Sequence, residues 1–272
     1  VKEDKKMIPI LLGVGAVLYT AASHSAINDL KEEIEDIQSE SQDLIDETRE
    51  LIETTNDNLK EALTTALEQH KKIYQTTLKR ATEITDKIRI KENNVGLYNE
   101  SQEVIDRISN IKESSFTKAP NLVAGGIMTA VGMSIGAMAG GVIGSTIVGV
   151  RMTMKVDEAK EERARVRYEC EEAKTECTKA RYTTNAINRS VGVVENLNEL
   201  LSVSENNVEY IIKNKGNDTR NWSKQDVESV RTMFNLVKAI SDIINTNILT
   251  EKGNMSGKYK KLIDNASEKF YV

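Results

Sequence analysis

The chain has 272 residues, of which 29% are charged and 4% are aromatic, and it carries a formal net charge of −5. With only two prolines, this composition favours long helices over a compact β-rich core. The mild acidity comes without a basic stripe or a ladder of aromatic residues, so nothing supports nucleic-acid binding. We therefore predict an all-α, elongated protein.

The N-terminal segment, residues 1–22, contains an apolar run at residues 7–22 that follows three lysines. Lysines before an apolar run are typical of a signal peptide, and the small residues near Ser25 fit a cleavage site. The run is short for a spanning helix, although a tilted or interfacial anchor could use it. We interpret residues 1–22 as a signal peptide or a membrane anchor, with a buried soluble helix as the third alternative.

The next segment, residues 23–120, begins with a long stretch that contains neither proline nor glycine up to about Glu92. Apolar or small residues recur there in alternating steps of three and four, which is typical of a coiled-coil seam. A second step of four, from Thr55 to Leu59, predicts local unwinding of the supercoil. The result is a rod of about 105 Å, followed by a short helix at residues 101–114. The main seam residues are Ile34, Ile37, Leu44 and Leu51.

The charges on this first rod are unevenly distributed. Residues 29–60 carry twelve acidic side chains against three basic ones, whereas residues 61–92 carry seven basic against five acidic. Charge runs of this kind usually form the solvated surface of a coiled coil. His70 lies on the seam itself, either as a tolerated polar residue or as a pH switch.

The C-terminal segment, residues 151–272, predicts a second rod and further helices. From Arg151 to about Lys213 the spacing of three and four returns, over about 95 Å. The loop that follows ends in Ser223 and Asp226, which predict the capped start of a helix at about 224–249. A last short helix closes the chain. The seam residues of the second rod are Val166, Cys170, Ala173, Cys177 and Ala180.

The two cysteines of this seam, Cys170 and Cys177, are the only ones in the chain. Seven residues along a helix place them on one face but about 10 Å apart, too far for a disulfide between them. We interpret them as small buried seam residues, with pairing across an oligomer as the alternative.

Between the rods lies an uncharged segment, residues 121–150, which is longer than the roughly twenty residues that a spanning helix needs. Its glycines recur every four residues, which lets helix backbones approach closely in lipid. In water each such glycine weakens a helix by about 1 kcal/mol relative to alanine. We predict a membrane segment, with a buried hairpin inside the bundle as the alternative. The packing glycines are Gly132, Gly136, Gly140 and Gly144, with Gly141 and Gly149 in the neighbouring row.

The path of this segment decides the topology. One crossing would leave the two polar halves of the chain on opposite sides of a membrane, as in an anchored receptor. A bend at Gly140 and Gly141 would instead let the two rods pair as an antiparallel hairpin, with the segment as their shared tip.

The second arrangement, rod 23–92, tongue 121–150 and rod 151–213, covers most of the chain. In this it resembles the α-helical pore-forming toxins, the family of cytolysin A and of the haemolysin BL and non-haemolytic enterotoxin components. Those proteins are long helical bundles with a hydrophobic tongue between two long helices. The resemblance implies secretion followed by insertion into a lipid bilayer, as a homo-oligomer or together with related helical subunits.

No catalytic motif appears in the sequence. The two histidines, His24 and His70, lack the spacing of a zinc site, and there is no GxxxxGK[ST] or GxSxG motif. We therefore expect neither an enzyme nor a cofactor or small-molecule substrate. The expected function is that of a membrane-inserting, oligomerising pore-forming toxin or toxin component. The alternatives are a membrane-anchored coiled-coil receptor, tether or scaffold, and a virion or secretion-machine protein that forms a membrane channel.

Overall fold

The computed structural model describes residues 21–90, 95–112, 116, 156–251 and 253–272. This part of the chain is built from helices and contains no β-strand, only two isolated bridges between single residues. The predicted all-α class is therefore confirmed.

The first long helix is continuous over three consecutive elements, α1 (Ala21–Ile73), the π-helical turn η1 (Tyr74–Leu78) and α2 (Lys79–Lys87). Ile73 and Leu78, at the two joints, keep right-handed helical dihedrals, so no loop separates the elements. The helix is about 100 Å long. It ends because Ile88 adopts an extended conformation, with a ψ of 118°.

Helix α3 (Val95–Ser109) begins six residues before the predicted helix 101–114 and ends five residues before its end. Gly96 lies in the first turn of α3. The earlier start has a packing reason. Leu97 is fully buried, and it continues N-terminally the buried face that includes Val104 and Ile108.

The second long helix, α6 (Val156–Lys215), ends at Gly216, whose φ of 77° breaks the helix. A short 3-10 turn, η4 (Thr219–Asn221), leads into α7 (Lys224–Ile244). The predicted cap of α7 is confirmed, because the Ser223 hydroxyl accepts from the Asp226 backbone N–H while the Asp226 carboxylate accepts from the Ser223 backbone N–H. Helix α8 (Gly257–Phe270) completes the chain.

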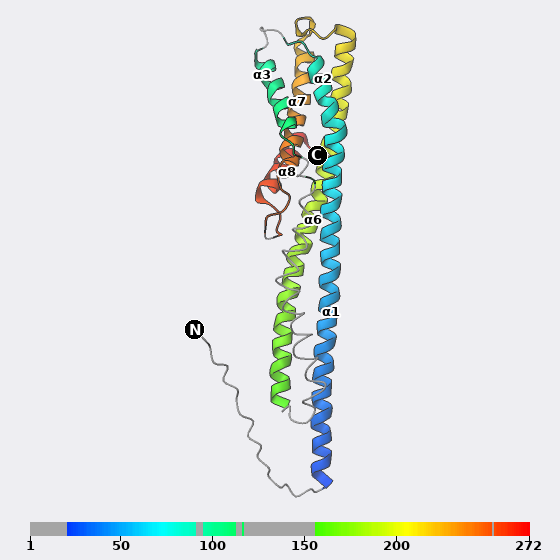
Figure 1. Ribbon diagram of the computed structural model, residues 1–272, viewed down its shortest axis with the longest axis vertical. Coiled ribbons are helices and arrows are strands. Elements are labelled where there is room, and N and C mark those ends of the chain that lie inside the picture. Colours follow the sequence, from blue (N-terminus) through cyan, green and yellow to red (C-terminus); the bar gives the residue numbers. More distant parts are fainter. Residues whose placement is uncertain (1–20, 91–94, 113–115, 117–155, 252) are drawn as a thin grey trace, which may run out of the picture.

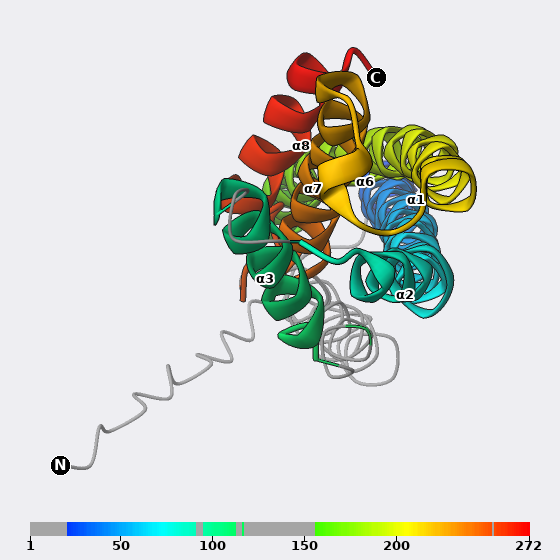
Figure 2. The same ribbon diagram turned by 90° about the horizontal axis from the view of Figure 1, so that it is seen from above.

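The molecule has two regions (Figure 1). The stalk consists of α1 up to residue 58 and α6 up to residue 179. The head consists of the remaining described residues, in which α3, α7 and α8 join the two long helices. Viewed along the long axis, these three helices all lie on one side of the α1–α6 pair (Figure 2).

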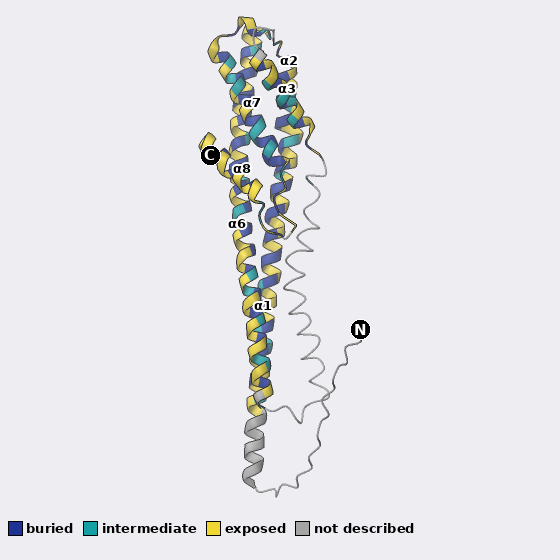
Figure 3. Cartoon of the chain, turned by 90° about the vertical axis from the view of Figure 1, so that its left-hand side faces the viewer, coloured by how far each residue is buried: buried dark blue, intermediate teal, exposed yellow. Residues whose placement is uncertain are grey.

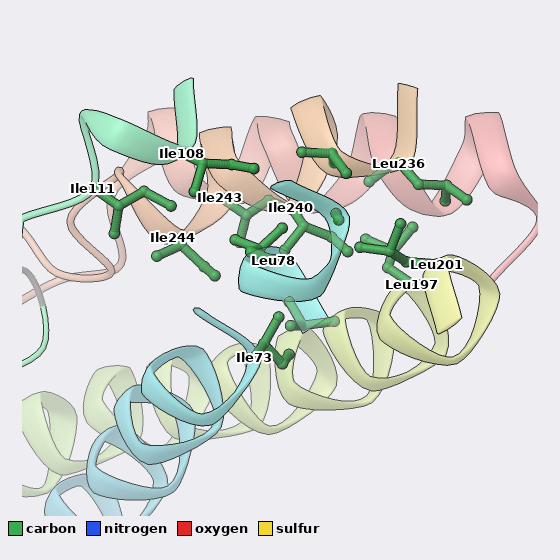
Figure 4. Packing of buried hydrophobic residues seen from close by; sticks show 14 of the residues in the cluster. Ile73, Leu78, Ile108, Ile111, Leu197, Leu201, Leu236, Ile240, Ile243 and Ile244 are labelled. Carbon is green, nitrogen blue, oxygen red and sulfur yellow. The ribbon is translucent and has the colours of Figure 1, made fainter. Parts of the chain in front are cut away.

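The two regions have separate hydrophobic clusters. The head cluster runs from Leu59 through all the head helices, and residues such as Leu78, Leu201 and Ile240 have no exposed surface. Figure 4 shows Leu78 facing Ile240 and Ile243 across the centre of this cluster. Burial is therefore dense in the head and reduced to a narrow line in the stalk (Figure 3). The stalk cluster has six buried members: Ile45, Ile52, Val166, Cys170, Ala173 and Cys177.

Candidate functional site

The glycines that the sequence singles out for membrane insertion lie outside the described residues, as do residues 1–20. These glycines are Gly132, Gly136, Gly140, Gly141, Gly144 and Gly149. The structure bears on them only through the described residues on either side of their segment, Phe116 and Val156.

Ion pairs along the stalk define how the two long helices pair. The Lys160 ammonium lies 2.8 Å from the Glu33 carboxylate, and the Arg163 guanidinium lies 2.9 Å from that of Glu40. In the head, the backbone N–H of Arg89 donates to the carbonyl of Asn217 at 2.8 Å. Partners thus keep a nearly constant separation in sequence along the whole rod, so α1 and α6 run in the same direction. The predicted antiparallel pairing is wrong.

The described residues that flank the uncharged segment, Phe116 and Val156, lie at different levels of the rod. The ring of Phe116 packs against that of Tyr74, 5.6 Å between centroids, at the level of the head. Nearby, the Thr77 hydroxyl donates to the Asn198 side chain at 2.7 Å. Val156 lies about 60 Å further down α6, at the stalk end. A hairpin whose two ends meet at a shared tip therefore does not fit this fold.

A single crossing that separates the two polar halves does not fit either. Helix α1 belongs to the N-terminal half and α6 to the C-terminal half, yet they pack along the stalk and into the head. The described parts of both halves therefore lie on the same side of any membrane. The parallel pairing also brings the N-terminal ends of α1 and α6 to one end of the rod, which we call the foot (Figure 1).

The predicted seam residues differ in how far they are buried. Six are buried in the stalk and at its upper end: Ile37, Val166, Cys170, Ala173, Cys177 and Ala180. The other three, Ile34, Leu44 and Leu51, are only half-buried.

Ile45 and Ile52, which the predicted seam omits, are buried beside the half-buried Leu44 and Leu51. On α1 the buried line takes two successive steps of four, from Ile37 to Ser41 and on to Ile45. The supercoil is therefore perturbed well before Thr55. The adjacent pairs Leu44–Ile45 and Leu51–Ile52 were the sign of this in the sequence. When two neighbouring residues are both apolar, the pattern does not determine which of them lies on the seam.

Two polar side chains on the stalk seam are satisfied within their own helix. The Ser41 hydroxyl donates to the Ile37 carbonyl and the Thr48 hydroxyl to the Leu44 carbonyl, each at 2.7 Å. Such bonds let small polar residues be buried without a cross-helix partner. Both cysteines are free and buried, and burial raises the pKa of the Cys177 thiol. Because the thiolate is the reactive form, a raised pKa makes this thiol a weak nucleophile.

The ion pairs of the stalk lie at its surface. Hydrogen bonds from Arg167 and Arg163 hold the pKa of the Glu40 carboxyl below its ordinary value. These side chains remain exposed, so solvent and salt screen them and each pair stabilises the stalk little. Their structural effect is to favour one direction and one register.

The head, in contrast, buries a carboxylate. The Glu205 side chain is 1% exposed, and neither oxygen has a hydrogen-bond partner among the described residues. The Arg80 guanidinium lies 3.5 Å from it but donates instead to Asn206 and Glu209, each at 2.7 Å. Desolvation raises the pKa of Glu205 to about 7, despite the opposing charge of Arg80. No sequence pattern predicts this burial, because Glu205 follows the buried Ser204 in a helix otherwise rich in exposed glutamates.

The outer face of α6, away from α1, carries three exposed tyrosines. Seven residues spaced strictly by heptads, from Val166 to Val208, are buried on the inner side of this helix. Two positions after members of that row lie Tyr168, Tyr182 and Tyr210, each about 70% exposed. They form a column of about 63 Å along the rod.

Two features that bear on the expected functions are absent from the described residues. Within residues 21–90, 95–112 and the C-terminal helices, no helix is both long and apolar enough to cross a membrane. The same part of the chain contains no group of three or more histidine, cysteine or acidic side chains that could hold a metal ion.

Comparisons with models of protein families, with curated proteins and with solved structures found no match for this chain.

Proposed function

We propose that this chain is a membrane-inserting rod that contacts the bilayer with its foot and holds its helical head away from it. The observation that carries the proposal is the parallel pairing of α1 and α6, fixed at the foot by the Lys160–Glu33 ion pair. Because of it, α1, which follows the apolar run in the sequence, and α6, which follows the uncharged segment 121–150, both begin at this end.

The parallel pairing favours a membrane-anchored tether or scaffold over the other expected functions. In such a protein the apolar residues 7–22 hold the foot at the bilayer, and the rod of about 100 Å sets the distance to the head. The small-residue face of segment 121–150 then packs against other helices in the lipid. The head, with its large apolar core, is the rigid part that a partner would meet.

A second candidate, an oligomeric pore former, is supported by the column formed by Tyr168, Tyr182 and Tyr210. Tyrosine is enriched at protein interfaces, where its ring contributes apolar area and its hydroxyl remains able to hydrogen-bond. Between Tyr182 and Tyr210 this face of α6 also carries Leu200 and Val203, both partly exposed. Side-by-side copies of the rod could bury this column.

Flotation of purified full-length protein with protein-free liposomes that contain a quenched dye tests both candidates. A tether floats with the liposomes and releases no dye, whereas a pore former floats and releases it. The double variant Gly136→Leu, Gly140→Leu removes the small-residue packing face in lipid. It is therefore expected to weaken the flotation or the dye release that the wild-type protein shows. Gly192→Leu is the matched control, because a side chain at this exposed α6 position meets nothing within 4 Å. Protein that stays unbound at every concentration contradicts the proposal.

The state of association separates the candidates further. If the tyrosine column is an interface, the variant Tyr182→Ser lowers the molar mass that light scattering measures for the membrane-bound protein after detergent extraction. Tyr98→Ser, at an exposed tyrosine of α3, is the control and leaves it unchanged. Monomeric protein in liposomes would rule out the oligomeric pore.

A further inference from the structure

The imidazole of His70 is 2% exposed and lies where α1 meets α6 and α8. The seam position predicted from the sequence places it between the long helices, but the structure adds a third helix. α8 brings Tyr259, which is fully buried, against the imidazole.

These groups form a hydrogen-bonded chain with a definite direction. The Ser190 hydroxyl donates to the Ile187 carbonyl at 2.7 Å, so its oxygen accepts from the Tyr259 hydroxyl at 3.1 Å. The Tyr259 oxygen is then free to accept from the His70 Nε2–H, 3.4 Å away. The neutral imidazole with its proton on Nε2 satisfies this arrangement. One polar chain thus joins α1, α8 and α6 through the apolar core.

The surroundings offer nothing to stabilise a charged imidazole. The charged residues next to the contact positions are all exposed: Lys71 on α1, Arg189 on α6, and Lys258 and Lys260 on α8. The carboxylate nearest to Tyr259 in the sequence of α8, that of Asp264, is exposed and lies within 4.0 Å of the Arg189 guanidinium. Among the described residues, the hydrogen bond of the His70 imidazole is with the Tyr259 hydroxyl, and no carboxylate forms an ion pair with it.

We propose that His70 is an acid-sensitive lock that docks α8 onto the two long helices, and that protonation of its imidazole releases α8 from the head. A second proton would leave a full charge in the apolar core with no counter-charge. Undocking of α8 is the smallest movement that admits water to the ring, because Tyr259 is the residue that covers it. The lock concerns the head alone and does not depend on membrane insertion.

The pH range in which α8 is released follows from the lowered pKa of the His70 imidazole. Burial lowers the pKa of His70 from 6.5 to about 4, so the docked form binds the proton less readily than the released form. The stability that docking contributes is therefore complete above about pH 6.5 and is lost as the pH falls toward 4. At pH 5 this linkage favours release by roughly tenfold or more relative to pH 7.

Hydrogen exchange of the full chain, corrected for the intrinsic pH dependence of exchange, measures the docking of α8. We expect protection in α8 to fall about tenfold or more from pH 7 to pH 5, while protection in α7 stays nearly constant. In the variant His70→Gln the amide can still donate to Tyr259 but cannot titrate, so the fall is abolished. His24→Gln, at the only other histidine, is the matched control and keeps the wild-type fall.

Histidine-labelled NMR of the wild-type protein gives a readout that does not need a variant to fold. Because the chain has only two histidines, the His70 signal is assigned by its loss in His70→Gln or, if that variant does not fold, by its persistence in His24→Gln. Titration of His70 well below 6, together with acid-dependent exchange in α8, supports the lock. An ordinary titration near 6.5, or an equal acid-induced loss of protection in wild type and His70→Gln, overturns it.

Discussion

The stalk and the head are built from the same two helices, yet they are held together in different ways. In the stalk, each helix contributes one narrow line of small or branched residues, and exposed ion pairs flank it. In the head, three further helices cover the pair, and the buried side chains become large and fully enclosed. Burial of apolar area dominates stability, so the head is the stable unit.

The stalk depends on the head for its register. A two-helix pair with cysteine, alanine, serine and threonine on its seam buries little area per residue and opens locally at low cost. The head fixes the relative position of α1 and α6 at the other end of the same helices. The stalk can then remain paired, and yet be the region that rearranges most easily.

The largest effect is all-or-none and concerns the direction of pairing. The thiol of Cys170 lies 3.9 Å from the Leu44 carbonyl oxygen. The variant Leu44→Cys, in a chain with Cys177→Ser, is therefore expected to form an intramolecular disulfide with Cys170 under mild oxidation. Peptide mapping by mass spectrometry detects the bond. Failure to cross-link, while the same variant with Cys170→Ser folds equally well, would contradict the parallel stalk.

The next effect compares the same substitution in the two regions. Ile240 in the head and Ile45 in the stalk both have no exposed surface. Ile240→Ala is expected to lower the free energy of unfolding by about 3–5 kcal/mol, because the tightly packed head cannot close the cavity. Ile45→Ala is expected to cost about 2 kcal/mol or less and to speed hydrogen exchange only in the stalk. Equal losses in urea denaturation would show that the two regions unfold as one unit.

A smaller effect depends on pH and concerns the buried carboxylate. The folded-state pKa of Glu205, about 7, lies above its ordinary value of 4.5. Its contribution to stability is therefore present below about pH 4.5 and is lost as the pH rises through 7. Glu205→Gln is expected to stabilise the protein by about 1 kcal/mol at pH 8 and not at pH 4.5. Denaturant titrations at the two pH values measure the difference.

The control for this prediction is Glu209→Gln, at the exposed residue that shares Arg80 with Glu205. It should not stabilise the protein at pH 8. If it does so as strongly as Glu205→Gln, repulsion between the two carboxylates, and not burial of one, raises the pKa of Glu205.

The smallest effect is expected for the stalk ion pairs. Glu40→Gln removes the carboxylate that accepts from both Arg163 and Arg167, but all three side chains are exposed to solvent. The free energy of unfolding should stay within experimental error at physiological salt, since such pairs are screened. A clear loss at physiological salt that disappears at high salt would mean that the stalk relies on these charges more than on its seam.

The direction of α6 could have been inferred from charge. Residues 29–60 of the first rod are acidic and residues 61–92 are mainly basic, whereas residues 191–212 of the second carry four glutamates and no lysine or arginine. Parallel pairing places Glu40 beside Arg163 and Arg80 beside Glu209. Antiparallel pairing would place acidic residues of both helices together. Heptad spacing alone could not decide this, because an apolar seam reads the same in either direction.

The sequence by itself determined the helices of this protein. The absence of glycine and proline from 23 to 92, the periodic seams and the Ser223 cap are local properties, and local backbone energetics is enough to express them. Only the tertiary structure decided which of Leu44 and Ile45 is buried, that α1 and α6 run parallel, and that α8 covers His70. These features depend on contacts between segments far apart in the chain, where burial and charge act together and no local pattern is sufficient.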